Sequence, residues 1–357
     1  MPLSIIKLTP GGVIKSLFSI PLLFTFANTC HAQPKEIRLK DVGSFHIGGE
    51  RVTLSGLPVK EVQAVAGGPV RKSDPNGDYQ VGQMYVQYML QANPVSNYPM
   101  MFWHGGGMTG VTWETKPDGQ PGWHAFFLRA GFDTYVSDAV ERGRSSWARY
   151  PEIVKSEPEH RTQNAGWNMF RIGPADGYHS EPAQRVAYQG ERFPVAYWDQ
   201  FWKQSVARWT TSNTMTLAAY RQLIDKVGPS ILVVHSQGAA FALTTAQNEP
   251  SRFKALVLLE PSGAPDPEKV DVAQVKDVKF LVFWGDYIAE SPLWSTYRAN
   301  VEKYLTAVKN AGGSVEYIDL PARGVKGNTH LLMMDNNSDE LAQMTFDWLK
   351  QQKLLKP

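Results

Sequence analysis

The second half of the chain alternates short apolar runs with longer mixed stretches, and most of the runs end at glycine or polar residues. Near-continuous apolar runs are typical of strands that are buried on both faces of a parallel sheet flanked by helices. The pattern therefore predicts an α/β fold with a mostly parallel central sheet. The six predicted core strands cover residues 98–103, 132–136, 230–234, 253–259, 278–284 and 315–320.

The region before residue 98 has a different pattern and predicts additional β-structure. Candidate strands lie at residues 51–54 and 82–90, where polar and apolar side chains partly alternate. Between them, residues 74–78 (Asp-Pro-Asn-Gly-Asp) look slightly like a calcium loop. The ligand spacing is wrong for calcium and no bidentate glutamate follows, so we interpret this segment as a turn.

Capping residues predict two helices near the end of the chain. Ser291 can cap a helix whose first residue is Pro292, and Gly312 lies just beyond its end. The last helix is expected to begin near Ser338, because acidic residues follow in its first turn and lysines lie near its end.

Residues 141–227 interrupt the strand–helix alternation and are rich in proline, glycine and aromatic residues. We interpret them as an inserted cap or lid over the site, between core segments 33–140 and 228–357. Extra helical packing at the sheet edge is the alternative, because many long connections are only structural.

The N-terminus has the features of a signal peptide. Lys7 and Lys15 precede an apolar run at residues 17–27, which is too short to span a bilayer comfortably. Cys30 and Ala32 offer small residues for cleavage after Ala32. A short membrane anchor is the less favoured alternative, so we expect a periplasmic or secreted protein that does not associate with the membrane after cleavage.

Composition narrows the chemistry of the mature protein. Cys30 is the only cysteine, so cleavage leaves no disulfide and no thiol nucleophile. The full chain carries a formal net charge of +2, and the removed segment takes Lys7 and Lys15 without any acid. The neutral remainder gives no electrostatic reason to expect nucleic acid or anionic membrane as a partner.

The central catalytic motif is Val234-His235-Ser236-Gln237-Gly238, which follows an apolar strand and opens a stretch of small residues. This is the strand–turn–helix context of a nucleophile elbow, in which a tight turn exposes the serine hydroxyl. The full pattern has glycine two residues before the serine, where this chain has Val234. Because Ser-x-Gly alone is common, the motif needs support from other residues.

That support comes first from the glycine run at residues 104–107 (His-Gly-Gly-Gly), which follows an earlier predicted strand. Glycines in this position allow backbone N–H groups to approach a developing oxyanion. We expect Gly106 to supply one donor and the backbone N–H of Gln237 the second. A flexible turn without function is the alternative.

The predicted base is His330, which is the only histidine after Ser236. It lies between the sixth core strand and the last helix. The order serine, acid, histidine fits an α/β-hydrolase. Two carboxylates can orient the imidazole. Asp286 follows the fifth core strand and Glu260 follows the fourth, and the pattern alone leaves this choice open.

Several longer motifs resemble a bacterial α/β-hydrolase group, the esterase-713-like carboxylesterases. They are residues 104–123, 141–145 (Glu-Arg-Gly-Arg-Ser), 235–238 and 327–335 (Gly-Asn-Thr-His-Leu-Leu-Met-Met-Asp). The resemblance implies a triad of Ser236, His330 and Glu260 with an oxyanion hole at Gly106 and Gln237, and leaves Asp286 as a structural carboxylate. Relatives can carry cysteines where this chain has Gly106 and Gly107, so the hole can differ in shape.

We therefore expect a serine carboxylesterase that needs no cofactor and no metal and that acts on a small-molecule ester with an apolar portion. A lactone, amide or polyester hydrolase with the same triad is the closest alternative. A non-catalytic binding protein on this scaffold is the alternative from another class. Dimerisation of the chain through the insertion stays open.

Overall fold

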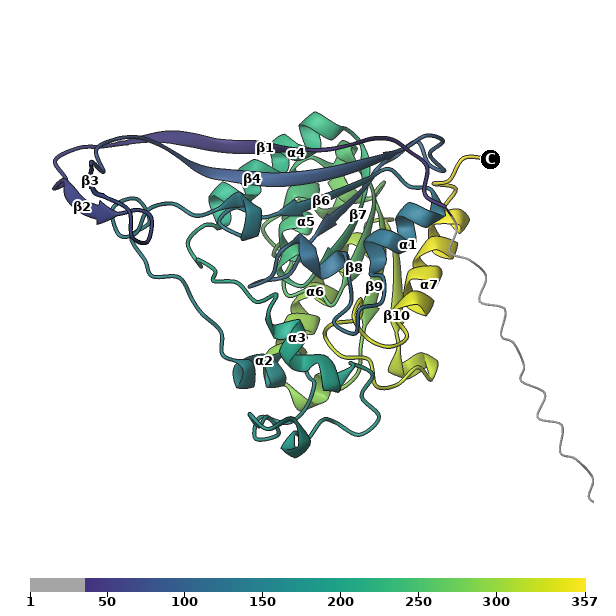
Figure 1. Ribbon diagram of the computed structural model, residues 1–357. Coiled ribbons are helices and arrows are strands. Elements are labelled where there is room, and N and C mark those ends of the chain that lie inside the picture. The colour runs from purple at the N-terminus through teal and green to yellow at the C-terminus, as the bar shows by residue number, and fades with distance from the viewer. Residues whose placement is uncertain (1–35) are drawn as a thin grey trace, which may run out of the picture. The chain divides into compact units, whose positions relative to one another are not determined.

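The computed structural model describes residues 36–357, so the predicted signal peptide and its cleavage site lie outside the described residues (Figure 1). The main sheet has eight strands in the order β1-β4-β6-β5-β7-β8-β9-β10. From β6 to β10 neighbouring strands are parallel, whereas β1 and β4 are antiparallel to their neighbours. The strands are β1 (Leu39–Leu54), β4 (Gly77–Gln91), β5 (Met100–Trp103), β6 (Thr134–Asp138), β7 (Ser230–His235), β8 (Phe253–Leu259), β9 (Lys279–Trp284) and β10 (Ser314–Asp319). A separate hairpin pairs β2 (Lys60–Gln63) with β3 (Val70–Ser73).

Helices cover both faces of the sheet, as Figure 1 shows. Alternate residues of each central strand enter different core clusters: Phe102 belongs to one cluster, and Met101 and Trp103 belong to the other. The first cluster contains side chains of α1 and α7, and the second contains side chains of α4, α5 and α6. The helices are α1 (Trp123–Ala130), α2 (Gln163–Met169), α3 (Trp198–Trp202), α4 (Asn213–Val227), α5 (Gln237–Asn248), α6 (Pro292–Asn310) and α7 (Ser338–Gln351).

The predicted α/β architecture is confirmed. Strand β8 has the predicted bounds, and the other five core strands begin and end within two residues of their predicted positions. Ser291 caps α6 by accepting a hydrogen bond from the Trp294 N–H at 3.4 Å, and α7 begins at Ser338. Among the described residues, no helix is both long and apolar enough to cross a membrane.

Two parts of the chain differ from the expectation. Strand β1 is much longer than predicted, because its exposed residues hide the alternation that marks a strand. Residues 213–227 belong to the predicted insertion but form α4, which packs on the sheet, where Tyr220 stacks on Trp103 with ring centroids 3.6 Å apart. Helix α4 therefore packs with the sheet, and the rest of the predicted insertion stays a prediction.

In the calcium-like segment, interpreted as a turn over residues 74–78, residues 74–76 form the short connection after β3, whereas Gly77 and Asp78 already belong to β4. The Asn76 N–H donates to the Asp74 carboxylate at 2.9 Å, and the Asn76 side chain bonds both backbone groups of Leu57. The polar side chains of Asp74 and Asn76 therefore already have hydrogen-bond partners within the protein.

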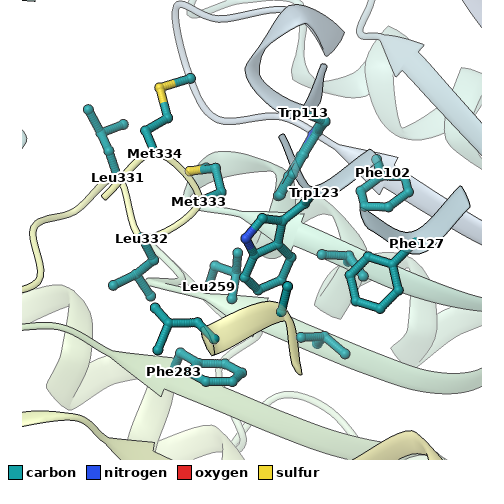
Figure 2. Packing of buried hydrophobic residues seen from close by; sticks show 14 of the residues in the cluster. Phe102, Trp113, Trp123, Phe127, Leu259, Phe283, Leu331, Leu332, Met333 and Met334 are labelled. Atoms are coloured by element: carbon teal, nitrogen blue, oxygen red, sulfur yellow. The ribbon is translucent and has the colours of Figure 1, made fainter. Parts of the chain in front are cut away.

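One apolar cluster lies directly beside the predicted base. The four residues after His330 are buried, and Figure 2 shows them with Trp123, Leu259 and Phe283 in one core. The Trp123 indole N–H also donates to the Ser338 carbonyl at 3.1 Å. Because residues 331–334 pack into the core, the backbone of His330 is held in place from its C-terminal side.

Candidate active site

Ser236 lies in the sharp turn between β7 and α5, as the motif predicts. Its backbone has φ 52° and ψ −116°, in a region that costs energy for any residue other than glycine. The surrounding backbone holds this turn. The Ser236 N–H donates to the Leu259 carbonyl at 3.0 Å, and the Ser236 carbonyl accepts from the N–H groups of Ala239 at 3.1 Å and Ser262 at 3.3 Å.

Glycine is required where the turn meets the glycine run. A Cβ on Gly238 would lie 2.6 Å from the His104 carbonyl oxygen, and a Cβ on Gly105 would lie 2.7 Å from Nδ1 of His235. Val234, which stands where the motif usually has glycine, is fully buried in the sheet core. The close approach here therefore depends on Gly105 and Gly238.

The two predicted oxyanion donors belong to Gly106 and Gln237, which line one cavity with Ser236. A Cβ on Gly106 would be 3.1 Å from Oε1 of Gln237, which is the first residue of α5. Within residues 36–357 neither backbone N–H donates a hydrogen bond to a protein acceptor. Two backbone donors are thus available next to Ser236, at a helix N-terminus whose dipole favours negative charge.

His104 fixes the start of the glycine run. Its Nε2 accepts a hydrogen bond from the Ala139 N–H at 2.9 Å, so Nδ1 carries the proton and donates to the Gly105 carbonyl at 2.8 Å. Burial lowers the pKa of His104 to about 4. This neutral histidine ties the run to the end of β6 and has no contact that would make it a base for Ser236.

The structure brings His330 and Glu260 together. Nδ1 of His330 lies 3.3 Å from Oε2 of Glu260, and both side chains are buried, at 1% and 0% exposure. The backbone N–H of His330 donates to the Phe170 carbonyl at 3.0 Å, and the imidazole ring packs between Phe170 and Trp294. With Nδ1 facing the carboxylate, Nε2 is the ring nitrogen left for proton transfer.

The second oxygen of Glu260 is held from the insertion. Oε1 accepts a hydrogen bond from Nη2 of Arg171 at 2.7 Å and another from the Gly285 N–H. Arg171 is 1% exposed, and its Nε also donates to the Asp286 carbonyl oxygen at 2.8 Å. The guanidinium therefore joins the turns after β8 and β9 and leaves Oε2 of Glu260 to face the imidazole.

The electrostatics around His330 keep its ring neutral. Burial lowers the pKa of His330 well below its ordinary value of 6.5, and the cations Arg171 and Arg161 lower it further. A neutral imidazole is able to accept a proton, which is what a general base for a serine must do.

Ser236 and His330 open into one cavity of about 180 Å³. Gly106 and Gln237 line the same cavity, together with Trp294 and with side chains from the insertion. Among residues 36–357, no group of three or more histidine, cysteine, aspartate or glutamate side chains is placed to hold a metal ion. The insertion residues on the cavity wall are Arg161, Met169, Phe170 and Arg208.

Comparisons with known proteins agree with this geometry. Residues 98–310 match the model of the alpha/beta hydrolase fold family. This chain belongs to the α/β-hydrolase superfamily. It is also 32% identical to a solved bacterial esterase, with a TM-score of 0.75 over 89% of this chain and 97% of that one. This match places it in the bacterial esterase group of the superfamily.

A curated relative of this α/β-hydrolase comes from a fungus. It is the probable secreted lipase phiG of Fungal sp. (strain ATCC 74256), 27% identical over 330 residues, which cover 77% of this chain and 88% of the relative. The two matches cover 77% and 89% of this chain, so the hydrolase assignment rests on most of the chain and not on a single motif.

In this α/β-hydrolase, the alternative acid Asp286 has no contact with the imidazole. Its carboxylate accepts hydrogen bonds from the N–H groups of Tyr287 and Gly327, both at 2.9 Å. The Asp286 N–H donates to the Asn328 carbonyl at 2.7 Å. Asp286 therefore fixes the beginning of the loop that carries His330.

Sequence reasoning missed the carboxylate that organises the same loop. Asp335 is fully buried and accepts hydrogen bonds from the Thr329 N–H and hydroxyl, both at 2.8 Å, and from the Asn328 amide at 2.9 Å. Burial raises the pKa of Asp335 to about 7. The only signal in the sequence was its place at the end of the motif 327–335.

His235 was expected to have a packing role, and it also holds the backbone of His330. Its Nε2 donates to the His330 carbonyl at 2.9 Å, and the two ring centroids are 4.4 Å apart. The pKa of His235 is lowered well below 6.5, chiefly by burial. The neutral ring thus connects the turn at Ser236 to the backbone of His330.

Proposed function

We propose that this chain is a serine carboxylesterase with Ser236 as nucleophile, His330 as base and Glu260 as the orienting acid. The observation that carries the proposal is the buried His330–Glu260 pair, because His330 lines the same cavity as Ser236 in its strained turn. The similarity to a bacterial esterase and to a probable secreted lipase supports ester bonds as the target.

The proposed reaction has two steps. His330 takes the proton of the Ser236 hydroxyl while the serine oxygen attacks the ester carbonyl, and the N–H groups of Gly106 and Gln237 stabilise the oxyanion. His330 then protonates the departing alcohol. Water, deprotonated by His330, attacks the acyl-enzyme and releases the acid.

Each partner has a defined part in this reaction. Glu260 stabilises the imidazolium that forms in each step, and it keeps Nδ1 as the protonated nitrogen. No cofactor takes part in the reaction as written. The apolar side chains Met169, Phe170 and Trp294 on the cavity wall favour an ester with an apolar portion.

The fungal relative's description as secreted supports export of this chain as well. We propose that residues 1–32 are a signal peptide cleaved after Ala32, and that the mature protein is periplasmic or secreted. N-terminal sequencing of the protein recovered from the periplasm or medium tests this, and a mature start at Gln33 is the expected result.

The substitution Ser236→Ala tests the catalytic proposal. We expect kcat/KM for a simple ester such as benzyl butyrate to fall by about 10⁴-fold or more, because the covalent step is lost. Matched ester, lactone and amide substrates then rank the wild-type activities. Near-native hydrolysis by folded Ser236→Ala would show that another group is the nucleophile.

A further inference from the structure

Two guanidinium groups lie on the wall of the cavity that contains the catalytic residues. Arg161 and Arg208 both line the cavity that contains Ser236 and His330. The lining includes no aspartate and no glutamate. Positive charge is therefore placed at the site without a carboxylate in the cavity to balance it.

The backbone holds both arginines in position. Residues 159 and 208 form an antiparallel bridge, with N–O distances of 2.7 and 3.1 Å. The Val206 N–H donates to the Gly107 carbonyl at 2.9 Å, which ties this bridge to the glycine run. The cationic wall is thus built into the insertion and docked on the oxyanion side of the site.

Only one of the two cations has a carboxylate partner. Nε of Arg208 donates to Glu159, whereas its Nη1 would lie 3.3 Å from a Cβ on Gly106. Arg161 has neither an ion pair nor a hydrogen-bond acceptor among residues 36–357. Its guanidinium lies 5.9 Å from the centre of the Phe170 ring, and its Nη1 would be 3.6 Å from a Cβ on Gly107.

Holding these cations close together costs free energy. Burial and the neighbouring Arg208 lower the pKa of Arg161. The same two causes lower the pKa of the nearby Arg142 to about 10. Partly desolvated like charges repel, and an anion between them relieves both the repulsion and the desolvation. Guanidinium groups bind carboxylates by two parallel hydrogen bonds.

We propose that the substrate is a short ester that carries a free carboxylate, bound by Arg161 and Arg208. The inference rests on the proposed esterase function and adds the class of substrate to it. Arg161 and Arg208 line the same cavity of about 180 Å³ as Ser236, so only a short chain can connect a carboxylate bound by them to the ester carbonyl. Hydrolysis adds water across the acyl C–O bond and releases an alcohol and an acid, so no co-reactant is needed.

The test compares esters that differ only in charge. In one pair, monobenzyl succinate carries the carboxylate on the acyl side, and benzyl succinamate replaces it with a neutral amide of the same shape. In the other pair, O-butyryl glycolate carries it on the alcohol side, with O-butyryl glycolamide as the amide. We expect kcat/KM for the acid to exceed that for its amide by about 10- to 100-fold in at least one pair.

Variants then assign the selectivity to the cavity arginines. Arg161→Gln should lower the acid-to-amide ratio by about tenfold. Arg221→Gln is the matched control, because Arg221 is exposed on α4 and pairs with Glu249. Arg221→Gln should leave the acid-to-amide ratio of kcat/KM and the thermal stability close to those of the wild type. The wild-type comparison requires no variant, so it decides the question even if Arg161→Gln does not fold.

Two negative results have different meanings. Equal kcat/KM for acid and amide in both pairs, by an enzyme that cleaves benzyl butyrate, would overturn the carboxylate proposal and leave the esterase proposal intact. A folded protein that cleaves no ester of the panel, benzyl butyrate included, would instead overturn the proposed function.

Discussion

The turns after β8 and β9 each carry a carboxylate next to the loop of His330, but the two side chains are used differently. Glu260 is fully buried at φ 50° and has its oxygens divided between His330 and the Arg171–Gly285 pair. Asp286 accepts hydrogen bonds from the backbone N–H groups of Tyr287, the next residue, and Gly327, in the loop that leads to His330. A position at the carboxyl end of a parallel strand therefore brings an acid close to the histidine, and its hydrogen-bond partners decide whether it contacts the ring.

Between the two carboxylates, the largest expected effect comes from neutralising Glu260. Glu260→Gln should lower kcat by about 10³- to 10⁴-fold with little change in KM, because the amide no longer stabilises the imidazolium. Steady-state kinetics on a neutral ester measure this. If Asp286→Asn reduced kcat more than Glu260→Gln, the assignment of the acid would have to be reversed.

Substitution of Arg171 tests whether Glu260 depends on its buried ion-pair partner. Arg171→Met should reduce kcat/KM by about 10²-fold through a misplaced carboxylate. It should also reduce the free energy of unfolding by about 3–5 kcal/mol, because Glu260 then stays buried without its ion-pair partner. Urea denaturation gives the second value.

The matched control for this substitution is Arg298→Met. Arg298 pairs with Glu302 and Asp319 at partly exposed positions away from the cavity. We expect it to lower the free energy of unfolding less than Arg171→Met does and to leave kcat unchanged. An equal loss of kcat in both variants would mean that the effect is one of general stability.

The pH dependence of activity sharpens the same point. The pKa of His330 lies well below 6.5, so the neutral base persists as the pH falls, and the acid limb of kcat/KM should lie below pH 6.5. Arg171→Met removes a cation that disfavours the imidazolium, so it should move this limb to higher pH. A wild-type limb above pH 6.5 would contradict the described environment of His330.

The smallest effect is expected for Asp286→Asn. The amide loses charge-assisted hydrogen bonds to the N–H groups of Tyr287 and Gly327, which should reduce the free energy of unfolding by about 1.5–3 kcal/mol. Because Asp286 does not touch the imidazole, kcat should stay within about tenfold of the wild type. Thermal unfolding and steady-state kinetics measure the two effects.

Much of the fold could be predicted from the chain because the central strands are buried on both faces. The run from Phe253 to Leu259 is apolar at almost every position, and its predicted bounds match β8. Helix α4 was assigned to the insertion, although Ala219, Tyr220 and Leu223 recur at helical spacing on its buried face. The aromatic residues around it masked this signal.

The candidate site was predictable only where local chemistry marks it. Ser236 and His330 stand in recognisable motifs, whereas the resemblance was needed to prefer Glu260 to Asp286. Arg171 contacts Glu260 across 89 positions of the chain. No local pattern reports such a pairing, and the same holds for Arg161 and Arg208 on the cavity wall.

The most direct test of the central claim is reaction of the wild-type protein with a fluorophosphonate, followed by peptide mass spectrometry. We expect one adduct per chain, on the hydroxyl of Ser236, and no adduct in Glu260→Gln within the time that labels the wild type completely. A folded protein that hydrolyses esters but carries the adduct on another residue, or carries none, would contradict the account.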